Sequence, residues 1–173
     1  MRVVAGSAKG RKLVAPPGQA TRPTTDRVRE AIFNALGSLG VVDGATVVDL
    51  FAGSGALGIE ALSRGADHAT FLDTDRNAIA AIRDNLDTTG LAGRATVIPA
   101  DATRWEGTAD LALLDPPYAM DDEGWRSLLS RLDAVTVVTE SDRAVDLGEQ
   151  WDVLRSKRYG TTVVQIATRK GPQ

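Results

Sequence analysis

A four-residue segment, Asp115-Pro116-Pro117-Tyr118, places a carboxylate, a rigid turn and an aromatic ring directly after an apolar run. Each proline fixes its backbone φ at about −65° and lacks an N–H, so the carbonyl groups of the turn become fixed acceptors. An exocyclic amino group could donate to Asp115 and to the Pro116 carbonyl while Tyr118 stacks on the ring that carries it. The segment favours chemistry on a planar amine, although Asp-Pro-Pro alone is equally typical of a turn that ends a strand.

A glycine-rich segment supplies a second pattern. Gly53, Gly55 and Gly58 fit the spacing G-x-G-x-x-G between a strand expected at 46–51 and a helix expected at 56–64, and Asp73 follows 20 residues after Gly53. In dinucleotide-binding proteins such glycines let the backbone approach the cofactor, and the acidic residue binds its ribose. A nicotinamide-dependent oxidoreductase is therefore one interpretation of this pattern.

Asp49 argues for a different cofactor. It ends the same predicted strand, four residues before Gly53, where a carboxylate would repel a bound pyrophosphate. S-adenosylmethionine (AdoMet) carries an ammonium and a sulfonium and no phosphate, so this carboxylate would attract it. Its adenosine still requires the glycine loop and Asp73, and its adenine amino group could donate to Asp101. The residues expected to contact AdoMet are Asp49, Phe51, Ala52, Gly53, Ser54, Gly55, Asp73, Asp101, Ala102 and Asp115.

Acidic residues recur where the predicted strands end. Taken singly, Asp73 and Asp101 could be turn or helix-cap residues. Together with Asp49 and Asp115, however, they occupy four such positions in succession. Because open α/β sheets bind ligands at the carboxyl ends of their strands, the repetition favours one binding site over four unrelated turns.

The composition narrows the class of protein. The chain has 173 residues, enough for one domain with a buried core, and it contains no Cys and a single His, His68. Disulfides, zinc clusters and Cys- or His-based nucleophilic catalysis are therefore excluded or nearly so, and we expect no metal. No segment has the length and apolarity of a signal peptide or a membrane span, so we expect a cytoplasmic protein without a membrane partner.

Positive charge is concentrated near the start of the chain. The net charge is −3, yet residues 1–30 contain seven basic and two acidic side chains, a net charge of +5, which leaves −8 on the remainder. The basic segment could be a solvated tail, or it could contact a polyanion, since attraction to phosphates is local and accumulates with each contact. The candidate phosphate contacts are Arg2, Lys9, Arg11, Lys12 and Arg22.

Apolar periodicity predicts an α/β fold. A short basic hairpin with strands at 2–5 and 11–15 comes first, and a helix follows Thr24-Thr25-Asp26 and stops near Gly40. Strands then alternate with helices, which is typical of a mostly parallel sheet covered on both faces, and a closing hairpin requires one antiparallel strand. The predicted strands are 46–51, 69–72, 95–98, 111–114, 135–139, 151–157 and 161–168, and the predicted helices are 56–64, 76–88 and 121–132.

Taken together, the motifs resemble the RsmD family of bacterial 16S ribosomal RNA guanine-N2 methyltransferases. The segments that carry the resemblance span nearly the whole chain and include Asp115-Pro116-Pro117-Tyr118. The chain departs from the family pattern at Ala5 and at Ser7-Ala8-Lys9, where the family has a glycine and a more basic turn. The other matching segments are 2–6, 10–13, 22–34 and 49–66.

The resemblance implies a fold, a cofactor and a substrate. The fold would be that of a Rossmann-like class I AdoMet-dependent methyltransferase, with a mostly parallel seven-stranded sheet in a domain at 23–173 and a basic hairpin extension at 1–22. A monomer would transfer the methyl group of AdoMet to N2 of a specific guanine in the 16S rRNA of the 30S ribosomal subunit. The catalytic residues would be Asp115, Pro116, Pro117 and Tyr118.

The residues alone leave alternatives open. An adenine-N6 or a glutamine-amide methyltransferase could use the same Asp-Pro-Pro-Tyr segment. A non-catalytic RNA-binding assembly factor could retain the same fold. Detectable methyl transfer would separate the enzymes from the binding protein.

Overall fold

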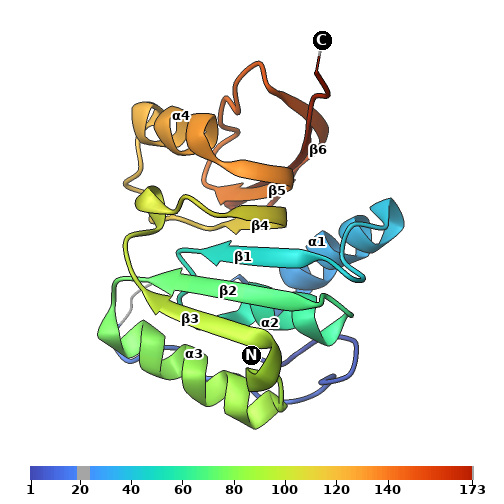
Figure 1. Ribbon diagram of the computed structural model, residues 1–173, viewed down its shortest axis with the longest axis vertical. Helices are drawn as coiled ribbons and strands as arrows, with labels where there is room; N and C mark the ends of the chain where they lie inside the picture. The colour runs from blue at the N-terminus through green and yellow to red at the C-terminus, as the bar shows by residue number, and fades with distance from the viewer. Residues whose placement is uncertain (19–23, 173) are drawn as a thin grey trace.

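The chain folds around a seven-stranded β-sheet (Figure 1). The computed structural model describes residues 1–18 and 24–172. The strands are β1 (Thr46–Leu50), β2 (His68–Asp73), β3 (Ala95–Pro99), β4 (Thr108–Leu114), β5 (Asp133–Ser141), β6 (Trp151–Tyr159) and β7 (Thr162–Arg169). They lie in the order β3-β2-β1-β4-β5-β7-β6, and β7 is the one strand among them with reversed direction, antiparallel to both β5 and β6. The predicted sheet with one reversed strand is confirmed.

Helices cover both faces of the sheet, as the burial along its strands requires. Val47 of β1 and Leu111 of β4 belong to one apolar cluster, whereas Val48 and Ala112, the next residues along, belong to a second. Successive side chains of a strand point to opposite faces, so continuous apolar runs supply both clusters. The first cluster packs α1 (Asp26–Leu39), α2 (Ala56–Ser63) and α3 (Arg76–Thr89), and the second packs α4 (Asp122–Arg131). None of these described helices is long and apolar enough to cross a membrane.

The strand order reverses beside β1. The chain moves outward from β1 through β2 to β3 and then returns to place β4 on the other side of β1. Leu50 of β1 pairs with Leu72 of β2 and with Leu114 of β4, so the loops that follow these strands leave from one edge of the sheet. In open α/β sheets ligands bind at this reversal point.

Helix boundaries follow from capping residues visible in the sequence. Thr25 accepts a hydrogen bond from the Val28 N–H at 3.2 Å, and α1 begins at the next residue. Gly40 ends α1 in the left-handed conformation. Asp75 and Asp121 cap α3 and α4 in the same way as Thr25 caps α1. Such side chains satisfy N–H groups that have no partner in the first helical turn, which is why these boundaries were predictable.

The N-terminal segment contains less β-structure than the sequence predicts. The predicted hairpin strands at 2–5 and 11–15 are reduced to a short antiparallel pairing of residues 1–3 with 10–13. It has one isolated bridge, between Arg2 and Lys12, and a hydrogen bond from the Val3 N–H to the Arg11 carbonyl at 3.0 Å. The predicted division of the chain after residue 22 falls among residues 19–23, outside the described residues, and stays a prediction.

Contacts with α2 hold the N-terminal segment against the rest of the domain. The Val4 N–H donates to both carboxylate oxygens of the buried Glu60, at 3.1 and 3.2 Å, and the Ala8 N–H donates to Ser63 Oγ at 2.9 Å. Gly6 is required at this contact, because its φ is +86° and an added Cβ would lie 1.8 Å from the Ser63 carbonyl oxygen. The side chains buried by this docking are Val3, Ala8 and Leu13.

Asn85 of α3 links the N-terminal segment to the glycine loop. Its Oδ1 accepts from the Val14 N–H at 2.9 Å, and its Nδ2 donates to the carbonyl oxygens of Val14, at 2.9 Å, and Ser54, at 2.8 Å. Asn85 is only 1% exposed, so water cannot readily replace the amide in these bonds.

We predict that Asn85→Ala lowers the free energy of unfolding by about 1–3 kcal/mol, because backbone groups of Val14 and Ser54 lose their partner. Urea denaturation followed by circular dichroism measures the change. Asn77→Ala removes an exposed amide from the same helix and should shift the free energy by less than about 0.5 kcal/mol. Equal losses in the two variants would contradict the linking role of Asn85.

Candidate functional site

Carboxylates gather at the carboxyl edge of the sheet, one from each of five adjacent strands. Asp49 and Asp73 lie at the ends of β1 and β2, and Asp101 and Asp115 follow β3 and β4. The structure thus brings together the four acids that the sequence predicts. Glu140 near the end of β5 is the fifth, and sequence reasoning missed it because the predicted strand stopped at residue 139. The signal that identified the others, an acid at a strand end, would also have found Glu140.

The glycine loop after β1 turns through left-handed backbone conformations. Phe51 has φ 61°, unusual for a residue with a side chain, and Gly53 and Gly55 have φ 60° and 79°. The loop is fixed to β2 by Asp73, whose Oδ2 accepts from the Gly53 N–H at 2.9 Å and whose Oδ1 accepts from the Asp75 N–H at 2.9 Å. Backbone strain held by such contacts is typical of binding loops. Asp73 still has lone pairs for a ribose hydroxyl.

Asp49 is buried beneath this loop. It is 1% exposed, and its Oδ2 accepts from the Gly58 N–H of α2 at 2.9 Å. Burial raises the pKa of Asp49 to about 8; the Gly58 hydrogen bond opposes the shift, and the charges of Asp73 and Glu140 add to it. A cation bound nearby would favour the ionised form and release a proton.

Asp101 caps the short 3₁₀ helix Ala102–Arg104. Its Oδ1 accepts from the Thr103 hydroxyl at 2.7 Å and from the Thr103 N–H at 2.9 Å, and these bonds lower the pKa of Asp101. The capping role considered from the sequence is therefore present. About half of the Asp101 side chain is exposed, and the following Ala102 is buried. The contact of Asp101 with an adenine stays a prediction.

The Asp-Pro-Pro-Tyr segment forms a turn immediately after β4. Pro116 is buried, the Pro117 carbonyl accepts from the Met120 N–H at 3.0 Å, and Tyr118 is 47% exposed. The exposed ring leaves one aromatic surface available at the edge where Asp115 lies.

Thr24, just before α1, contacts two of the edge carboxylates. Its hydroxyl donates to Glu140, with oxygen–oxygen distances of 2.7 and 2.9 Å, and lies 3.4 Å from Asp115 Oδ2. Sequence reasoning assigned Thr24 to the start of a helix and missed this contact, because the three residues are far apart in the chain. Thr24 and Glu140 thus belong beside Asp115 in the candidate site.

The predicted RNA-phosphate contacts lie in the docked N-terminal segment. Lys9, Arg11 and Lys12 are exposed, and so is Arg2, although its Nη1 donates to the Gly10 carbonyl at 2.8 Å. Arg22 lies outside the described residues. The candidate RNA-binding role of all five stays a prediction.

The sheet order, the reversed β7 and the glycine loop are those of Rossmann-like methyltransferases. A family model described as Conserved hypothetical protein 95 matches residues 1–168, and the chain belongs to that family.

Named relatives match over nearly their full lengths. The chain is 43% identical over 188 residues to the Bacillus subtilis protein named "Putative rRNA methyltransferase YlbH", covering 99% of this chain and 100% of that one. It is 35% identical over 187 residues to "Ribosomal RNA small subunit methyltransferase D" of Escherichia coli K12, covering 98% and 90%. Among solved structures, "Putative methyltransferase yhhF from Escherichia coli" superimposes with a TM-score of 0.85 at 34% identity, covering 99% of each chain.

We predict that Asp49→Asn makes the free energy of unfolding less dependent on pH. The folded protein holds the Asp49 proton up to about pH 8, whereas the unfolded chain releases it above the ordinary value of 3.8. Wild-type stability should therefore fall between about pH 4 and pH 8, by roughly 1.4 kcal/mol per pH unit from this group, and Asn lacks this dependence. Urea unfolding of both proteins at pH 5, 6 and 7 measures the difference.

The exposed Asp84→Asn on α3 controls for the loss of a surface carboxylate. Its stability should follow the wild-type pH profile. If Asp49→Asn also follows that profile, Asp49 does not hold a proton in the folded state.

Proposed function

We propose that this protein transfers a methyl group from AdoMet to N2 of a guanine in small-subunit ribosomal RNA. One observation carries the proposal: Leu50 and Leu114 pair across β1 and β4, so the glycine loop and the Asp-Pro-Pro-Tyr turn leave the sheet side by side. A cofactor held by the loop would lie next to an amine held by Asp115. The relatives named as rRNA methyltransferases support RNA as the substrate, and they also favour a cytoplasmic enzyme.

The residues around the glycine loop fit AdoMet. Apart from its two chain neighbours, no atom of the described residues lies within 4 Å of where a Cβ would stand on Gly53, so a ligand could approach the loop backbone there, and Asp73 would accept from ribose hydroxyls. The buried Asp49, whose pKa is raised by desolvation and further by the charges of Asp73 and Glu140, is better suited to a cationic ligand than to a pyrophosphate, since another anion would add to this repulsion. AdoMet supplies an electrophilic methyl group on a sulfonium, with S-adenosylhomocysteine as the leaving group.

Asp115 and the prolyl carbonyl would activate the amine. The lone pair of guanine N2 is delocalised into the ring, so it is a poor nucleophile until its N–H groups are held by acceptors that favour a pyramidal nitrogen. Hydrogen bonds to Asp115 and Pro116 would strengthen as positive charge develops on this nitrogen, which is the condition for lowering the barrier. Tyr118 would hold the base plane so that N2 faces the methyl group in line with its bond to sulfur. The surplus proton on N2 then leaves after the N–C bond forms.

The target base would have to be unstacked. N2 of a guanine within a helix cannot enter a turn at the edge of a sheet, so the substrate is a loop nucleotide or a flipped base. The assembled 30S subunit, which exposes such loops in a fixed form, is the expected substrate.

We predict that Asp115→Asn reduces single-turnover methyl transfer by at least about 100-fold, because an amide is a weaker acceptor for a nitrogen that becomes cationic. Affinity for AdoMet, measured by calorimetry, should stay within about threefold, since the proposed partner of Asp115 is the amine. Asp121→Asn, which alters an exposed helix cap after the same turn, serves as the matched control. An Asp115→Asn rate equal to wild type would exclude the orienting role.

Mass mapping of methylated nucleosides tests the function as a whole. The 16S rRNA from cells with and without the gene should differ by one N2-methylguanosine, and purified protein with AdoMet should restore it on 30S subunits from the deficient cells. An N6-methyladenosine instead would identify the adenine-specific alternative, and no change in either experiment would refute RNA methylation.

A further inference from the structure

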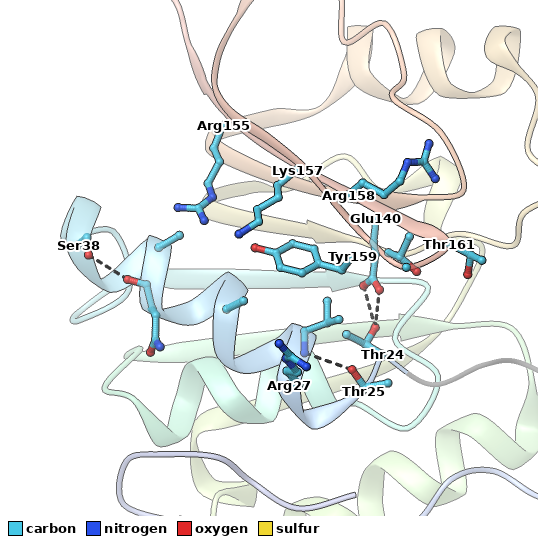
Figure 2. A pocket seen from close by; sticks show the side chains of 16 residues that line it. Thr24, Thr25, Arg27, Ser38, Glu140, Arg155, Lys157, Arg158, Tyr159 and Thr161 are labelled. Carbon is cyan, nitrogen blue, oxygen red and sulfur yellow. Dashed lines mark hydrogen bonds between the residues drawn. The ribbon is translucent and has the colours of Figure 1, made fainter.

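A cavity of about 930 Å³ opens between α1 and the β6–β7 hairpin (Figure 2). One end contains Thr24 and Glu140, the residues hydrogen-bonded to each other beside Asp115. From there the cavity follows α1 as far as Ser38, with Arg155 opposite. It therefore starts at the candidate catalytic turn and leads away from it.

Side chains of β6 enter this cavity because of a β-bulge. Val153 pairs with Ala167 and Arg155 pairs with Ile166, so Leu154 is an extra residue in the strand. In a strand without a bulge, side chains two residues apart lie on the same face, so Arg155 would share the face of Val153. The bulge instead turns 155, 157 and 159 to the face that α1 covers, and Figure 2 shows Arg155, Lys157 and Tyr159 pointing toward α1.

The cavity is cationic although most of the chain is acidic. Its lining includes the cations Arg27, Arg155 and Lys157 and the single carboxylate Glu140. Arg158 also lines the cavity, but its side chain points away from α1 in Figure 2. The remainder of the chain after residue 30 has a net charge of −8, so this is a local reversal of sign. The Lys157 Nζ lies 5.1 Å from the centre of the Tyr159 ring, which adds a flat aromatic surface beside the cations.

We propose that this groove, formed by α1 and β6, binds the single-stranded RNA that flanks the target guanine. The inference rests on the proposed function and adds a location for the substrate. Phosphates adjoining the flipped base would contact Arg155 and Lys157, and a neighbouring base would stack on Tyr159. Cationic grooves that contain an aromatic ring bind single strands in this way, and phosphate contacts fix the position of the strand without reading its sequence.

Charge selects RNA over other occupants of the groove. The cofactor does not account for this groove, because none of the residues proposed to bind AdoMet lines it. The five carboxylates at the sheet edge would repel a polyanion that approached the site directly. The cations of the groove would instead attract it along a surface that ends beside Asp115. The N-terminal cations would then contact a second part of the substrate.

The test is the salt dependence of binding to 30S subunits. For the double variant Arg155→Gln/Lys157→Gln, the slope of log affinity against log salt concentration should become shallower by about 0.7 for each lost phosphate contact. KM for subunits should rise while the single-turnover rate at saturation stays near wild type. AdoMet affinity and the thermal midpoint, measured in parallel, report whether the variant is folded.

Two further variants sharpen the comparison. Arg83→Gln/Arg126→Gln removes two exposed cations from α3 and α4, away from the groove, and should keep the wild-type slope. The variant Arg155→Lys/Lys157→Arg conserves both charges and should also keep the wild-type slope. If the two residues served only in packing, exchanging their shapes would be expected to impair binding.

A slope and KM equal to wild type in folded Arg155→Gln/Lys157→Gln would overturn the inference. The inference would also be overturned if the slope became equally shallow in the control variant Arg83→Gln/Arg126→Gln. Binding is measured without turnover, so absence of methyl transfer by the wild type would refute the proposed function while the slope still decides whether the groove holds RNA.

Discussion

The pairing of β1 with β2 on one side and β4 on the other is the constraint on which the site depends. Both edges of β1 are hydrogen-bonded, and its side chains alternate between two packed faces. A slip by one residue would move Val47 and Val48 to the wrong faces, so the register is strongly fixed. That register places the glycine loop between Asp73 and the Asp-Pro-Pro-Tyr turn. The proposed methyl donor and acceptor are therefore positioned next to each other, at the adjacent carboxyl ends of β1 and β4.

Five carboxylates at one edge of the sheet repel one another. Hydrogen bonds stabilise some of them, and a raised pKa favours the neutral form of Asp49. Asp73 and Asp101 accept two hydrogen bonds each, and those from Thr103 lower the pKa of Asp101. Asp49 accepts one from Gly58, yet its pKa is raised because desolvation outweighs that bond. Burial thus raises the pKa of Asp49, whereas the Thr103 hydrogen bonds lower the pKa of the half-exposed Asp101. A cation bound at this edge would favour the ionised form of Asp49.

The same electrostatics constrain how RNA could approach. An acidic edge repels phosphates, so contacts with a nucleic acid have to come from separate cationic surfaces. Two are available among the described residues: the N-terminal segment docked on α2 and the groove between α1 and β6. Neither is an appendage that moves independently, since Val3 and Leu13 belong to the main apolar cluster and Tyr159 packs against it. In our proposal, the substrate is therefore positioned by the same core that positions the cofactor.

The sequence by itself determined the features that depend on neighbours along the chain. Caps such as Thr25, apolar periodicity and the acids at strand ends predicted the helices, the parallel sheet and four of its five edge carboxylates, because each signal is local. Only the tertiary structure decided which distant residues meet. Thr24 and Glu140 are 116 residues apart, and the N-terminal segment docks on α2 through a hydrogen bond from the Val4 N–H to Glu60. The bulge at Leu154 reverses the face of Arg155, because a strand's register depends on the partner it pairs with.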